Sequence, residues 1–145
     1  MNERGIVDVL GGTAVLGRTI GDGLELADAV GRGLPRRSLE RVKEAMGLTD
    51  REVARTVGLS QKSIGRLRRT RRSALGPVVS DRLYRMAALY ALAERVLEGR
   101  EAAREWLRSP QVGLNRRVPL ELLGTEAGAR IVEELLGRIE HGVLA

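Results

Sequence analysis

The stretch from Leu48 to Arg72 reads LTDREVARTVGLSQKSIGRLRRTRR and decides the fold, because it holds two short helices and the turn between them. Thr49 and Glu52 have the spacing of a capping box, in which the hydroxyl accepts from a backbone N–H three residues on and the carboxylate reaches back. Gly58 ends the first helix, and Ser60 is an N-cap for the second. Helices this short are unstable alone, so the pattern predicts that they pack on each other and on a preceding helix.

The second of these helices is predicted to separate apolar from cationic side chains. With residues about 100° apart around a helix, Ile64 and Leu67 fall within about 60° of each other and form a buried stripe. Lys62, Arg66 and Arg69 gather on the opposite side. The helix is therefore expected to bury its aliphatic side and to turn its cations toward solvent.

The charge of the chain is concentrated around this segment. The 145 residues have a formal net charge of +6, and residues 35–75 hold twelve basic and four acidic side chains, a net charge of +8. Residues 1–34 carry a net charge of −2, and residues 76–145 carry ten of each sign. A local charge of +8 creates a positive potential that suits phosphate backbones or acidic surfaces.

A cationic second helix after a tight turn is typical of a helix-turn-helix, in which that helix lies in the DNA major groove. Gln61 is suited to adenine, and Lys62 or Arg66 to guanine, whereas phosphate contacts are expected from Arg51, Arg68, Arg69, Arg71 and Arg72. The alternative is a solvated basic face on an ordinary helical hairpin. The predicted DNA-binding residues are Arg51, Ser60, Gln61, Lys62, Ser63, Arg66, Arg68 and Arg69.

The rest of the chain also predicts an all-α fold. In the glycine-rich N-terminal third, a short helix after Asp22 is expected to use Leu24, Ala27 and Val30 as its apolar face. From Pro35 the helical spacing sharpens, with a stop at Gly47. The stretch SALGPVVS is interpreted as a connector, Ser80 as the cap of a long helix ending at Gly99, and Thr125 as the cap of a last helix with an apolar face of Ile131, Leu135, Leu136 and Ile139.

Composition argues against an enzyme, a metal protein and a membrane protein. The chain has no cysteine, and its one histidine, His141, lies at a helix end. Glu133 and Glu134 are adjacent, so they diverge around a helix and do not form a carboxylate pair. The longest uncharged stretch, residues 9–17, is about half a membrane span. We expect no cofactor, no metal and a cytoplasmic location.

Read together, the two halves of the chain resemble the Xre/MbcA/ParS-type antitoxins, the partners of RES-domain toxins. The first half carries the Xre-like helix-turn-helix, GLTDREVARTVGLSQKSIGRLRR. The more specific likeness is the C-terminal stretch AREWLRSPQVGLNRRVPLELLGTEAGARIVEELLGRIEHGVLA. The chain departs from the usual pattern at residues 115–117, where the family often has small residues, and at Leu144, where an aromatic residue is common.

The resemblance implies an all-α antitoxin with an Xre-like helix-turn-helix unit and a small helical toxin-binding region. Such antitoxins dimerise, repress their own operon at DNA that is expected to be palindromic, and neutralise a RES toxin that acts on NAD. The segments expected here are 1–34, 35–75 for DNA and 76–145 for the toxin. The toxin-binding residues implied are Trp106, Arg116, Arg117, Ile139, His141, Val143, Leu144 and Ala145.

Three alternatives stay open at this point. Val143 and Leu144 either insert into the toxin or pack back on the core of the chain. The protein as a whole could instead be a stand-alone repressor whose C-terminal region only dimerises. It could also be a protein-binding adaptor whose helix-turn-helix no longer contacts DNA.

Overall fold

The structure is a computed structural model that describes residues 2–70 and 74–142, and its regular elements are helices. Within those ranges no β-strand occurs, and the only bridges are the isolated pairs Pro35–Ala74 and Gln111–Arg117. The all-α prediction is confirmed. No helix in this part of the chain combines the length and the hydropathy that spanning a bilayer requires.

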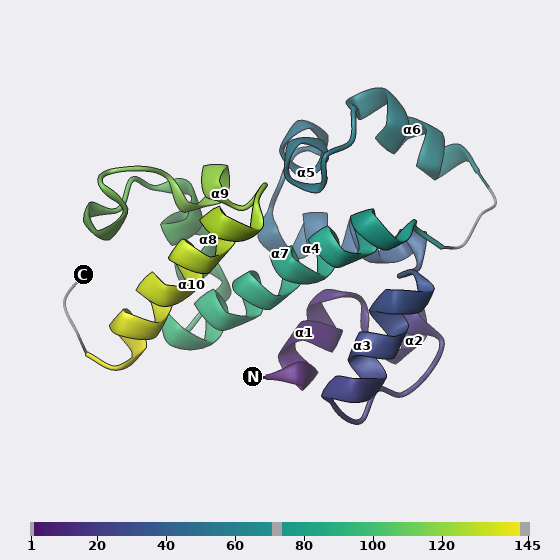
Figure 1. Cartoon of the computed structure of the whole chain (residues 1–145), viewed down its shortest axis with the longest axis horizontal. Helices are drawn as coiled ribbons and strands as arrows, with labels where there is room; N and C mark the ends of the chain where they lie inside the picture. The colour runs from purple at the N-terminus through teal and green to yellow at the C-terminus, as the bar shows by residue number, and fades with distance from the viewer. Residues whose placement is uncertain (1, 71–73, 143–145) are drawn as a thin grey trace. The chain divides into compact units, whose positions relative to one another are not determined.

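The chain forms two compact units, Met1–Ala88 and Leu89–Ala145 (Figure 1). The first contains α1 (Glu3–Val9), α2 (Gly12–Leu16), α3 (Gly23–Arg32), α4 (Arg36–Met46), α5 (Asp50–Val57), α6 (Gln61–Arg69) and the start of α7 (Pro77–Val96). The second contains the end of α7, α8 (Arg100–Arg108), the 3-10 helix η1 (Val112–Leu114), α9 (Pro119–Leu122) and α10 (Glu126–Glu140). The predicted functional segments 1–34, 35–75 and 76–145 stay a prediction.

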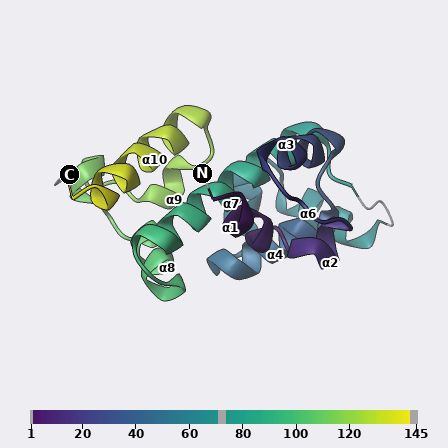
Figure 2. The same ribbon diagram turned by 90° about the horizontal axis from the view of Figure 1, so that it is seen from below.

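The core of the first unit is built around α4. Both α1 and α2 pack against this helix (Figure 2), and the Ser38 hydroxyl donates a hydrogen bond of 2.7 Å to the Leu10 carbonyl. Leu39, Val42 and Met46 of α4 are buried. Apolar residues from the rest of this unit are buried as well: Leu10, Leu26, Leu34, Val53, Val57, Ile64 and Leu83. The glycine-rich N-terminal third therefore contributes to the same core as the following helices.

The predicted apolar face of α3 is wrong in part. Asp22 caps this helix as expected, accepting from the Glu25 N–H at 2.9 Å. Leu24, however, is 79% exposed, and Leu26 is the residue buried in the core. The three-residue spacing predicted a buried stripe, but in α3 Leu24 and Ala27 are exposed and Val30 is half-buried.

The start of α7 also differs from the prediction, because the helix begins at Pro77 and not after Ser80. Proline suits the first turn of a helix, since its missing N–H would have no partner there. Ser80 is fully buried inside the helix, where its hydroxyl accepts from the Leu34 N–H at 2.9 Å and lies 3.4 Å from the Leu75 carbonyl. Its role is to satisfy backbone groups of the preceding segments.

In the second unit, α9 packs against both α8 and α10 (Figure 1). The Thr125 cap of α10 is confirmed by its bond from the Gly128 N–H at 3.0 Å. The predicted apolar face of α10 needs one correction: Val132 is fully buried, whereas Ile131 is 48% exposed. The long helix ends at Val96, and Glu98 takes a left-handed conformation at φ 60°, so Gly99 is not its stop.

Gly128 and Gly137 of α10 give a matched test of this packing. A Cβ atom at Gly128 would lie 2.1 Å from the Leu122 carbonyl oxygen, whereas one at Gly137 would meet no atom within 4 Å. We expect Gly128→Ala to lower the free energy of unfolding by about 2 kcal/mol or more, and Gly137→Ala to raise it by about 0.5 kcal/mol. Urea denaturation of both variants measures the difference, and equal effects would contradict the packing of α9 on α10.

Candidate functional site

The α5–α6 pair is held by the caps that its sequence predicts. The Thr49 hydroxyl accepts from the Glu52 N–H at 3.1 Å, and the Thr49 N–H donates to Glu52 Oε1 at 2.9 Å, so the capping box is complete. Ser60 Oγ accepts from the Ser63 N–H at 3.0 Å and caps α6. Each bond satisfies an N–H group that the first turn of a helix leaves without a partner.

The turn between the two helices requires glycine at position 58. Gly58 has a φ of 76°, in the left-handed region. Arg82 of α7 also occupies the space beside it: its Nη1 donates to the Val57 carbonyl at 3.0 Å, and a Cβ at Gly58 would lie 2.0 Å from that nitrogen. Arg82 thus satisfies a carbonyl at the end of α5, and its guanidinium would have to move to admit a larger residue at position 58.

The side chains of α6 divide as the helical spacing predicts. Ile64 is buried and Leu67 is half-buried, while Lys62, Arg66 and Arg69 are exposed. Gln61 is also exposed, at the start of the helix. Within the described ranges none of the three cations takes part in an ion pair. The exposed side of α6 is therefore a cationic surface, which we define as Gln61, Lys62, Arg66 and Arg69.

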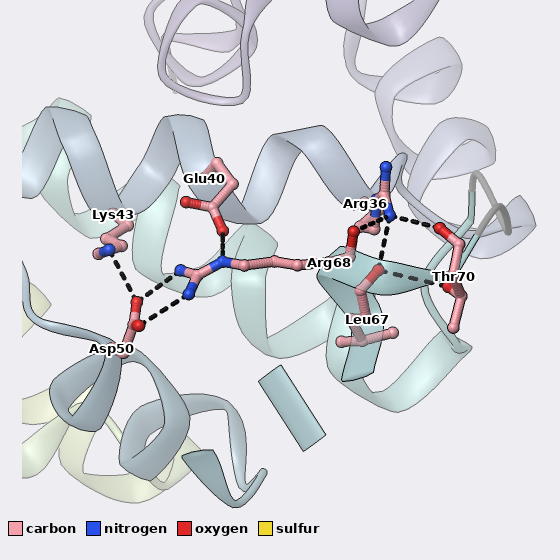
Figure 3. Close-up of polar contacts among 7 residues, drawn as sticks. All are labelled: Arg36, Glu40, Lys43, Asp50, Leu67, Arg68 and Thr70. Atoms are coloured by element: carbon pink, nitrogen blue, oxygen red, sulfur yellow. Dashed lines mark hydrogen bonds and ion pairs between the residues drawn. The ribbon is translucent and has the colours of Figure 1, made fainter. Parts of the chain in front are cut away.

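Arg68, predicted as a phosphate contact, is already bound to carboxylates of the protein. Its guanidinium donates to Asp50 from Nη1 and Nη2, at 2.8 and 2.5 Å, and to Glu40 from Nε at 2.5 Å (Figure 3). Lys43 Nζ lies 2.7 Å from the same Asp50 carboxylate. The positive charge of Arg68 is therefore already paired with two carboxylates. These bonds tie α6 to α4 and to the start of α5.

Asp50 is the electrostatic centre of this network. Hydrogen bonds from Arg68 and then from Lys43 hold the pKa of the Asp50 carboxyl well below its usual value. Because the folded-state pKa lies below the unfolded one, the network stabilises the fold fully above about pH 4. That contribution is lost as the pH falls and the carboxylate becomes protonated.

Arg36 forms a second attachment at the other end of α6. Its Nη1 donates to the carbonyls of Leu67 and Arg68, at 2.7 and 2.9 Å, and also to the Thr70 carbonyl (Figure 3). The last carbonyls of a helix have no intrahelical partner, and a cation there also favours the helix dipole. No local pattern in the sequence identified this role, since the partners lie more than thirty residues from Arg36.

The other predicted DNA-binding residues are placed as follows. Arg51 is exposed in the first turn of α5. Ser60 is exposed and Ser63 half-buried, and their hydroxyls lie 3.0 Å apart. Arg71 and Arg72 lie outside the described residues.

The residues predicted to bind a toxin are distributed over the second unit. Trp106 and Ile139 are half-buried, in α8 and α10, and Arg116 and Arg117 are exposed on the loop before α9. His141 is exposed at the end of α10. The remaining three, Val143, Leu144 and Ala145, lie outside the described residues. In the part of the chain that is described, no three His, Asp or Glu side chains gather in a way that could hold a metal ion.

The contacts of Arg36 and Arg68 that hold α6 are referred to as the clamp. Arg68 and Arg69 are adjacent, but only Arg68 belongs to the clamp, so replacing each in turn tests it. We expect Arg68→Met to lower the free energy of unfolding by roughly 1 kcal/mol, because Glu40 loses its ion pair and Asp50 keeps only Lys43 as a partner. Arg69→Met, which breaks no ion pair with a described residue, should change it by less than about 0.5 kcal/mol. Urea denaturation at low salt and at 1 M NaCl checks this, and the deficit of the first variant should shrink at high salt. Equal stabilities would show that the clamp does not hold α6.

Two family models match consecutive parts of the chain. Residues 25–88 match the Antitoxin Xre-like helix-turn-helix domain, which spans α4, α5 and α6. Residues 92–142 match the Antitoxin Xre/MbcA/ParS C-terminal toxin-binding domain, which covers α8, η1, α9 and α10. The boundary between the matches falls close to the division between the two compact units.

Individual proteins are similar over most of the chain. The Antitoxin Xre of Yersinia enterocolitica is 32% identical over 138 residues, covering 92% of this chain and 93% of that protein. The Antitoxin Xre of Photorhabdus laumondii is 28% identical, with 90% of each covered. A chain in the crystal structure of the M. tuberculosis MbcT–MbcA toxin–antitoxin complex superposes with a TM-score of 0.55 at 25% identity, over 76% of this chain and 96% of that one. The protein therefore belongs to the Xre antitoxin family and joins the family's helix-turn-helix domain to its C-terminal toxin-binding domain.

Proposed function

We propose that this antitoxin neutralises a RES-domain toxin that acts on NAD, and that it represses its own operon through α6. The observation that carries the second part is the exposed cationic surface of Gln61, Lys62, Arg66 and Arg69. The C-terminal match and the likeness to a toxin–antitoxin complex support the first part. Because the proposed targets are operator DNA and a toxin that acts on NAD, we propose that the protein acts in the cytoplasm. We assign the chain no catalytic role of its own.

The geometry of α6 supports major-groove binding. A recognition helix presents its first turns to base edges while neighbouring groups grip phosphates. Gln61 and Lys62 lie in the first turn and Arg66 one turn later, so these three are assigned to bases. Arg69 and Arg51 are assigned to phosphates. Ser60 and Ser63, at the start of α6, remain proposed DNA contacts. Arg68 is reassigned from contacting phosphate to holding the helix.

The exposed cations of α6 are suited to binding DNA because the helix that carries them is held in place. Ion pairs within the protein would have to be broken before these side chains could reach phosphate, and no such pair involves Lys62, Arg66 or Arg69 in the described ranges. The clamp by Arg36 and Arg68 limits how α6 can tilt. Less conformational freedom then has to be lost when the protein binds DNA.

Binding of the toxin is assigned to the second unit. The predicted residues Trp106, Arg116, Arg117, Ile139 and His141 all lie within the C-terminal match. The tail from Val143 to Ala145 follows α10, and we propose that it obstructs access to the active site of the toxin. We further propose a homodimer that reads a palindromic operator, because helix-turn-helix proteins commonly bind two related half-sites.

The DNA-binding part is tested by the salt dependence of operator affinity. We expect Arg69→Gln to reduce the slope of log K against log [NaCl] by about one, because one phosphate contact is lost. The control, Arg4→Gln in α1, should leave the slope unchanged. Fluorescence anisotropy on the promoter DNA of the operon measures both. If changing Lys62, Arg66 and Arg69 together leaves affinity and slope unaltered, the adaptor interpretation is correct instead.

The toxin-binding part is tested by co-expression with the product of the adjacent gene, which the proposal expects to be a RES-domain toxin. The wild-type chain should form a stable complex with the toxin and restore growth. Deletion of residues 139–145 should abolish the rescue because the active site of the toxin becomes accessible. Circular dichroism of the truncated chain controls for folding. Rescue that survives the deletion would refute the obstruction mechanism, and failure of the wild type to bind would favour the stand-alone repressor.

A further inference from the structure

The loop between α8 and α9 contains two successive non-glycine residues in left-handed backbone conformation (Figure 1). Asn115 has a φ of 57° and Arg116 a φ of 66°. Asparagine tolerates this region because its short polar side chain can bond locally. Arginine has no such compensation, so its Cβ is placed unfavourably against its own backbone. Arg116 is therefore the strained position of the loop.

Backbone hydrogen bonds on both sides of Arg116 hold it in the left-handed conformation. The Arg116 N–H donates to the Gln111 carbonyl at 2.8 Å, and the Gln111 N–H donates to the Arg117 carbonyl at 3.1 Å. The Gln111 side-chain amide donates to the Trp106 carbonyl at 3.0 Å, which fastens the loop to the end of α8. Leu114 is buried and anchors the loop in the core. The loop thus has a defined shape that would suit glycine at position 116.

Within the described residues, the guanidinium of Arg116 forms no ion pair that would offset the cost of this backbone conformation. Arg116 and Arg117 are both exposed, and neither forms an ion pair with a residue of the described ranges. Val112, at the start of the same loop, is 80% exposed although it is apolar. A strained backbone position that the surrounding structure holds in place is typical of a functional site. Arginine is also among the residues enriched at the centres of protein interfaces.

We infer that Arg116 determines toxin specificity by binding a carboxylate on an acidic patch of the toxin's surface, with Val112 contacting apolar atoms at its edge. The inference rests on the proposed toxin binding and adds the chemistry of the partner's surface. Arginine binds carboxylates with two parallel hydrogen bonds, and a preorganised loop loses little freedom on binding. A protein carboxylate fits better than a polyanion, because residues 76–145 have no net charge.

The test compares Arg116→Gly with Asn115→Gly, two variants that each place glycine at a left-handed position. Neither should lower the melting temperature of the free antitoxin, and Arg116→Gly should raise it because strain is released. Arg116→Gly should weaken binding of the purified toxin from the adjacent gene about tenfold, mainly through faster dissociation. Asn115→Gly should bind as the wild type does. The wild-type affinity should also fall more steeply with NaCl than that of Arg116→Gly.

Several results would overturn the inference. A toxin complex that forms with the wild type and is equally strong with Arg116→Gly refutes the specificity role while the proposed function stands. Parallel losses of melting temperature and affinity in both variants would show that the loop acts only through its shape. A loss of operator affinity from Arg116→Gly without a loss of toxin affinity would assign the residue to DNA. Absence of any complex with the wild-type chain overturns the proposed function and this inference together.

Discussion

The attachment of α6 by two arginines is the interaction on which the cationic surface depends. The helix has nine residues and one fully buried aliphatic anchor, Ile64. A helix of this length is unstable alone, and one buried side chain cannot set its direction. Arg68 joins it to Asp50 and Glu40, and Arg36 binds the carbonyls at its end (Figure 3). Polar contacts therefore supply the orientation that hydrophobic packing alone leaves open.

Arginines of the same helix thus have two different roles, holding the helix in place and offering charge to solvent. The side-chain chemistry alone does not show which arginine has which role. Arg68 and Arg69 are adjacent and equally basic, but one faces α4 and α5 while the other faces solvent. The difference follows from the 100° step between neighbours on a helix and from where the carboxylates of α4 and α5 lie. Counting arginines in such a segment overestimates how many are available to a polyanion.

The second unit uses close backbone packing in place of a polar clamp. Gly128 lets α10 approach the Leu122 carbonyl at a distance that no side chain permits. The loop before α9 is fixed by its own backbone hydrogen bonds and by Gln111. A rigid support of this kind can present strained or apolar residues such as Arg116 and Val112 to a partner, because the loop does not collapse around them.

Local chemistry by itself determined the helix-turn-helix pair, the caps of α3, α5, α6 and α10 and the two-sided character of α6, but not the ends of α7. The bonds of Thr49, Ser60 and Thr125 each join groups three residues apart, so they can be recognised without knowing the fold. Tertiary structure alone decided which arginines are used internally, since Arg68 meets Asp50 and Glu40 across 18 and 28 residues, and Arg36 meets Thr70 across 34. It also decided that Leu26 and Val132, not Leu24 and Ile131, enter the core. Spacing along a helix identifies a stripe of apolar residues, but only the neighbouring helices select the part of its circumference that is covered.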